Sequence, residues 1–102
     1  MGEEPEAELG EEELVAKLEE ELRQLTVSDI LFQTAITLSS LGFRKLSEED
    51  RDLDQARLAI EGLRAIVPLL SDAVPEQTTR DLTQVIANLQ LAYAKTVSEG
   101  DV

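Results

Sequence analysis

The feature that most constrains this chain is an uncharged stretch from residue 30 to residue 43, ILFQTAITLSSLGF. Across the whole sequence, 30% of the residues are charged. The stretch predicts a helix, but its apolar side chains lie on every side of that helix and not along one stripe. Such a helix is stable only when it is covered all round, by its own chain, by a second copy or by lipid.

Length and composition favour helix-on-helix packing. The 102 residues predict one domain, and the 3% of aromatic residues leave a core built from Leu, Ile, Val and Ala. A chain this short buries roughly 60–70% of the surface that its unfolded form exposes, so its own core is thin. Oligomerisation would add the burial that a small monomer lacks.

Most of the negative charge lies near the N-terminus. Residues 1–21 hold ten Glu and one Lys, which gives −9 of the net charge of −13. Residues 1–9 have no apolar periodicity and are predicted to form a disordered acidic tail. The tail is expected to be a solvated segment, with docking on a basic protein partner as the alternative. A chain of this charge disfavours nucleic-acid binding and anionic membranes.

Four helices follow from the apolar spacing. Leu14, Leu18, Leu22 and Leu25 form the stripe of an amphipathic, acidic first helix whose order is expected to depend on docking. Thr26 is expected to cap the second helix in a capping box with Asp29, and the helix is expected to run to about residue 41. Gly42 is expected to close this helix in the left-handed conformation.

Two further helices complete the pattern. Ser47 is expected to cap a third helix, which Pro68 kinks or ends at residues 67–68, with helical turns resuming through residue 70. Pro75 suits the first turn of a fourth helix. Short loops then predict an all-α fold, a small up-and-down helical bundle of three to four helices over residues 10–97. Residues 98–102 are expected to fray.

The order of these signals resembles a bacterial group of small proteins, domain-of-unknown-function family 1844. The resemblance covers roughly residues 26–96 and rests on the uncharged helix (Asp29 to Gly42), on the helix that begins Asp52-Leu53-Asp54-Gln55-Ala56, and on a last helix with Leu89 and Tyr93. It implies an all-helical cytoplasmic protein without an established activity.

Motifs for catalysis and metal binding are weak. The chain has no His and no Cys, which removes the usual bases, thiol nucleophiles and zinc ligands. Asp50, Asp52, Asp54 and Glu61 match the carboxylate spacing of an EF-hand, but Gln55 replaces the glycine that its sharp turn requires. We therefore expect no enzymatic activity, no cofactor and no metal site.

The functional hypothesis is an assembly or protein-interaction module that forms a homodimer or small homo-oligomer through the uncharged helix, around residues 28–41. The predicted interaction residues are Leu31, Phe32, Ala35, Ile36 and Leu38. The alternative is a helical pocket for an apolar ligand or lipid tail. An interfacial membrane helix is disfavoured because this one carries no Lys or Arg on a polar face. The N-terminus lacks the positive region of a signal peptide, so the expected location is the cytoplasm.

Overall fold

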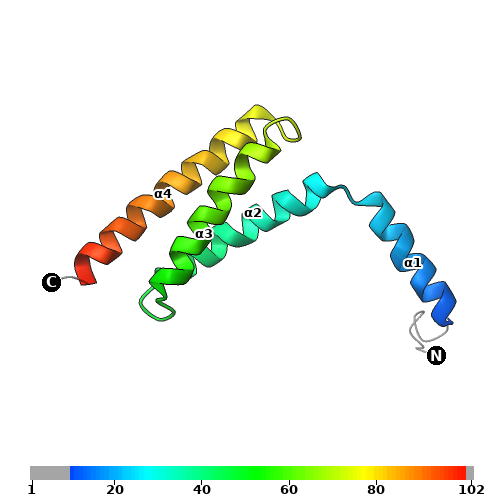
Figure 1. The fold of residues 1–102 in the computed structure, drawn as a ribbon, viewed down its shortest axis with the longest axis horizontal. Coiled ribbons are helices and arrows are strands. Elements are labelled where there is room, and N and C mark those ends of the chain that lie inside the picture. Colours follow the sequence, from blue (N-terminus) through cyan, green and yellow to red (C-terminus); the bar gives the residue numbers. More distant parts are fainter. Residues whose placement is uncertain (1–9, 101–102) are drawn as a thin grey trace, which may run out of the picture.

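The computed structural model describes residues 10–100, and all of its regular elements there are helices. In order they are α1 (Glu11–Gln24), α2 (Val27–Arg44), α3 (Leu53–Ile66), the short 3-10 helix η2 (Val67–Leu70) and α4 (Glu76–Gly100). Helices α2, α3 and α4 pack side by side with η2, while α1 projects from the N-terminal end of α2 (Figure 1). The predicted all-α fold is confirmed, and the predicted disordered tail, residues 1–9, lies outside the described residues.

The core of the three-helix bundle is aliphatic, as the composition predicted. Each of the three helices and η2 contributes to it, and Leu63, Leu70 and Leu89 are completely buried. The aromatic rings of Phe32 and Tyr93 pack against this core from partly buried positions, and small residues occupy several of the fully buried contact positions. The buried hydrophobic residues are Ala35, Leu46, Ala56, Ala59, Ile60, Leu63, Val67, Leu70, Leu82 and Leu89.

The start of α2 is the one that the sequence predicts. The Thr26 hydroxyl accepts a hydrogen bond from the Asp29 backbone N–H at 3.0 Å, and the Asp29 carboxylate accepts one from the Thr26 N–H at 3.1 Å. The two bonds satisfy donors that the first turn of a helix otherwise leaves free. The capping box between Thr26 and Asp29 is therefore confirmed.

The end of α2 differs from the prediction. The helix continues through Gly42 to Arg44, and no glycine of the described chain has a positive φ. Gly42 is buried, and a Cβ at this position would stand 3.1 Å from Leu89 Cδ2 and 3.4 Å from Ala59 Cβ. Glycine is thus needed here for the close approach of α4 and α3, and the left-handed closure was wrong.

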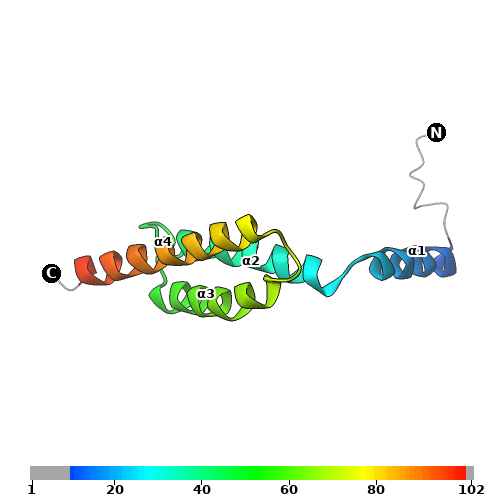
Figure 2. The same ribbon diagram turned by 90° about the horizontal axis from the view of Figure 1, so that it is seen from above.

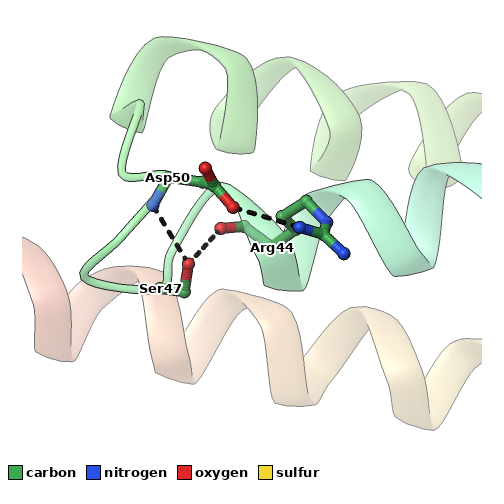
Figure 3. A network of polar contacts seen from close by, with 3 residues as sticks. All are labelled: Arg44, Ser47 and Asp50. Atoms are coloured by element: carbon green, nitrogen blue, oxygen red, sulfur yellow. Dashed lines mark hydrogen bonds and ion pairs between the residues drawn. The ribbon is translucent and has the colours of Figure 1, made fainter.

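The start of α3 also differs. Its N-cap is Asp52, whose carboxylate accepts from the Gln55 N–H at 3.2 Å, and Ser47 lies in the preceding loop. Ser47 donates to the Arg44 carbonyl at 2.7 Å and accepts from the Asp50 N–H at 3.3 Å, while Arg44 pairs with Asp50 (Figure 3). The predicted Ser47 cap therefore stabilises a turn and not a helix.

Proline acts as expected at the other end of α3. The α-helix ends at Ile66, and the chain continues as the 3-10 helix η2, with Pro68 in its first turn, as far as Leu70. Pro75, expected in the first turn of the fourth helix, instead immediately precedes α4, and its carbonyl accepts from the N–H groups of residues 78 and 79. Helix α4 extends to Gly100, so residues 98–100, expected to fray, are helical.

Helix α1 does not dock on the bundle of its own chain. It has no buried residue, and the two views show it continuing away from α2 (Figures 1 and 2). Its connector consists of Leu25 and Thr26, both with extended backbone, which carries α1 outward. The radius of gyration is 19.2 Å, against about 13 Å for a compact chain of this length. The intrachain docking expected for this helix is thus not realised.

Candidate interaction surface

The uncharged helix is covered by its own chain on one broad side. Ala35 is completely buried, and Leu31, Phe32 and Leu38 pack against the same core. Only Ile36, at 42% exposed, presents a large part of its side chain to solvent. Four of the five predicted interaction residues are therefore occupied within the chain, and an interface on α2 has to use its other side.

Two glycines allow α3 and α4 to pack closely against α2. A Cβ at Gly62 of α3 would stand 3.0 Å from Leu38 Cδ1, and Gly42 of α2 lies against Leu89 of α4. Helix α3 therefore covers the side of α2 that bears Leu38, and α4 covers a neighbouring side. These two contacts leave the remaining surface of α2 facing outward.

Two hydroxyl groups of α2, those of Thr34 and Ser39, donate hydrogen bonds within the helix. Thr34 Oγ1 donates to the Ile30 carbonyl at 2.8 Å, and Ser39 Oγ donates to the Ala35 carbonyl at 2.8 Å. Both bonds reach back one turn, which is the usual role of hydroxyls in an apolar helix. The bonds of Thr34 and Ser39 therefore have a structural role within the helix.

An uncharged surface runs along the outer edge of the contact between α2 and α3, and we call it the seam surface. The contact lies between Leu38 of α2 and Gly62 of α3. On α2, Thr34 and Leu41 lie one turn before and after Leu38. On α3, Leu58 and Ala65 lie one turn before and after Gly62. Its large members are between 43% and 75% exposed. The seam surface comprises Val27, Ile30, Thr34, Thr37 and Leu41 of α2 and Leu58, Gly62, Ala65 and Leu69 of α3 and η2.

Helix α1 carries a second uncovered apolar surface, the arm stripe, formed by Leu14, Val15, Leu18 and Leu22. These residues are between 39% and 67% exposed in the folded helix. They stand at spacings of one, three and four residues, which places them on one face. The following residue of the connector, Leu25, is 49% exposed and continues the stripe toward α2.

The rest of α1 is strongly charged. It holds six Glu and two basic residues, Lys17 and Arg23, for a net charge of −4. Arg23 pairs with Glu20 at 2.6 Å on the outer side, where both side chains are largely exposed. The acidic first turn, Glu11 to Glu13, lies at the positive end of the helix dipole, which favours it. The arm stripe is consequently flanked by carboxylates on both sides.

Part of this arrangement is predictable from the sequence. The apolar spacing predicts the stripe of α1 but places it in the bundle of the same chain, and it does not distinguish Leu58 or Leu69. The available signal was that Leu58, Gly62, Ala65 and Leu69 recur at spacings of four, three and four beside the core heptad of α3. This second stripe was hidden by the stronger core pattern.

Other kinds of site find little in the described residues. Over residues 10–100 no three acidic side chains lie together in a way that could hold a metal ion, and no helix is both long and apolar enough to cross a membrane. The Asp and Glu residues with EF-hand spacing lie partly on α3, since that helix begins at Leu53. Surface depressions, including one lined by Glu76, Arg80 and Gln84, open to solvent beside charged side chains.

In comparisons with known proteins, no family model, no curated protein and no solved structure matches this chain significantly. The resemblance to domain-of-unknown-function family 1844 therefore stays a prediction.

Proposed function

We propose that this protein is a non-catalytic assembly module that associates with itself through the exposed side of its uncharged helix α2 and through α1. The observation that carries the proposal is the arm stripe, four aliphatic side chains on one face of a helix, which the rest of residues 10–100 leaves uncovered. An isolated 14-residue helix is marginal in water, and most helical stability comes from packing of an apolar face. A partner surface supplies that packing.

Several observations favour this over the alternatives. The chain carries no His or Cys, and on α2 the hydroxyls of Thr34 and Ser39 are bonded to backbone carbonyls, so few groups that serve in catalysis are present. A lipid tail or apolar ligand requires an enclosed apolar cavity, whereas the centre of the bundle is filled by Leu63, Leu70 and Leu89. The pocket hypothesis thus has less support than self-association. A cytoplasmic location stays a prediction.

The test is the molar mass of the full chain in solution, measured by light scattering after size exclusion and by sedimentation over a wide concentration range. Self-association predicts a dimer or small oligomer that dissociates on dilution. Replacing Leu18 and Leu22 by Glu should abolish it. The matched control replaces Ala16 and Gln24 by Glu, which adds the same charge to the same helix away from the arm stripe. A monomer at millimolar concentration would overturn the proposal.

A further inference from the structure

Two uncovered apolar surfaces on one chain raise the question of what each contacts. Resting on the proposed self-association, we infer that α1 of each copy docks on the seam surface of the other, so that two copies exchange their N-terminal helices. The partner of the arm stripe is then the seam surface of a second copy, and not a second arm stripe.

Helix α1 and the seam surface have the same length. Helix α1 has 14 residues and is about 21 Å long at 1.5 Å per residue. On α2, the seam surface from Val27 to Leu41 spans 14 residue steps, again about 21 Å. One α1 helix therefore reaches along the whole seam surface. The arm stripe itself, from Leu14 to Leu22, spans 8 residue steps or about 12 Å, so its side chains become buried against the middle of that surface.

Charge selects the seam surface over a second α1. Two α1 helices side by side would bring two net charges of −4 into contact, with Glu19 and Glu21 at the edges of the stripe. The seam surface has no charged side chain among its residues. Asp54 and Glu61 stand one turn from Leu58, and Glu61 pairs with Arg57, so an acidic helix meets less repulsion here than beside a second α1. Leu58 and Leu41 supply apolar area at one end, and Val27 and Ile30 at the other.

The direction of the chain fits a two-fold exchange. Helix α1 extends beyond the N-terminal end of α2 (Figure 2). The connector joins the C-terminal end of α1 to the N-terminal end of α2. A two-fold axis near the two connectors brings the N-terminal ends of both α2 helices together, so a docked α1 runs antiparallel to the α2 of the other copy. The Glu11–Glu13 turn then lies at the C-terminal end of the other α2, close to Arg44 and Lys45, which carry positive charge there although Arg44 also pairs with Asp50. Antiparallel helices have favourably opposed dipoles.

The experiment uses three single variants of the full chain: Leu18→Asp on the arm, Leu58→Asp on the seam surface, and Leu91→Asp as the control. Leu58 and Leu91 are 60% and 70% exposed, so neither change removes core packing. Circular dichroism confirms that each variant keeps its helix content. Helix exchange predicts that the arm and seam variants each raise the dimer Kd at least about a hundredfold, since a carboxylate is desolvated at both contacts, and that the control leaves the Kd unchanged.

Mixing supplies the decisive measurement. A heterodimer of Leu18→Asp and Leu58→Asp keeps one contact, between the intact arm of one copy and the intact seam surface of the other. Both substitutions fall in its other contact, where the second Asp adds little cost because one Asp already releases the arm, whereas each homodimer loses both contacts. The equimolar mixture should therefore associate more tightly than either variant alone. If Leu58→Asp dimerises like the unmodified chain, or if mixing restores nothing, helix exchange is overturned while self-association stands. A monomeric unmodified chain overturns both.

Discussion

The close approach of α2 and α4 predicts that Gly42→Ala destabilises the fold although alanine is the better helix former. In a helix interior, alanine is favoured over glycine by about 1 kcal/mol. The new methyl group would stand 3.1 Å from Leu89 Cδ2, and Leu89 is completely buried and cannot move aside. Overpacking of this kind costs about 1–3 kcal/mol, which leaves a net loss of about 1 kcal/mol.

The matched substitution is Gly62→Ala, at which the methyl group would stand 3.0 Å from one terminal carbon of Leu38. Leu38 is only partly buried, so its side chain can rotate away, and the helix preference of alanine should prevail. Thermal unfolding followed by circular dichroism should show Tm falling by about 5 °C for Gly42→Ala. For Gly62→Ala, Tm should stay the same or rise.

A double variant identifies the cause. Leu89→Val removes one methylene and by itself costs about 1 kcal/mol. In that background Gly42→Ala should become stabilising by up to about 1 kcal/mol, because the space has been vacated and the helix preference remains. If Gly42→Ala stabilises the unmodified chain, or if its penalty persists unchanged beside Leu89→Val, the assignment of Gly42 to a close helix contact is wrong.

Three other measurements follow from the described contacts. Asp52→Ala should lower the free energy of unfolding by about 1 kcal/mol because α3 loses its cap, and Ser47→Ala should lower it less. Urea unfolding measures both values. Equal losses would contradict the observed start of α3 at Leu53. Thr79→Val should raise the free energy of unfolding by up to about 1 kcal/mol, since the buried Thr79 hydroxyl has no hydrogen-bond partner in the described chain. If the variant is instead less stable than the unmodified chain, the Thr79 hydroxyl has a hydrogen-bond partner in solution. Leu18→Ala removes three carbons from a side chain that is 52% exposed, so each docked arm loses about 1.2 kcal/mol of binding free energy. The dimer has two such arms, so its Kd should rise about 60-fold in sedimentation. An unchanged Kd would place Leu18 outside the interface.

The contrast between two helix starts shows how far local reasoning reaches. The capping box of Thr26 and Asp29 has no nearby competitor, and it was predicted correctly. Before α3, Ser47 and Asp52 both satisfy the local rule for a cap. The choice is made by Leu46, which is buried in the core, and by the Asp52 N–H, which donates to the Lys45 carbonyl at 2.8 Å. These contacts require a loop over residues 47–51, so the helix starts later.

The candidate interaction surface was predictable in the same partial way. Periodicity identified the apolar stripe of α1 and the absence of charge on α2, because residues three or four apart share a helix face whatever surrounds it. It did not identify which of the α2 side chains remain exposed. Leu31, Ala35 and Leu38 form as good a stripe as Val27, Ile30 and Leu41, and only the positions of α3 and α4 distinguish the two.

By itself, then, the sequence determined the helices, the proline break after α3, the aliphatic core and the presence of an uncharged helix that must be covered. These follow from backbone geometry and side-chain chemistry within about one turn of each residue. The tertiary structure decided that α3 and α4 cover one side of α2, with Gly42 and Gly62 at the closest contacts. It also decided that the extended connector of Leu25 and Thr26 carries α1 away from its own bundle. Those outcomes depend on contacts between residues far apart in the chain, which no local pattern records.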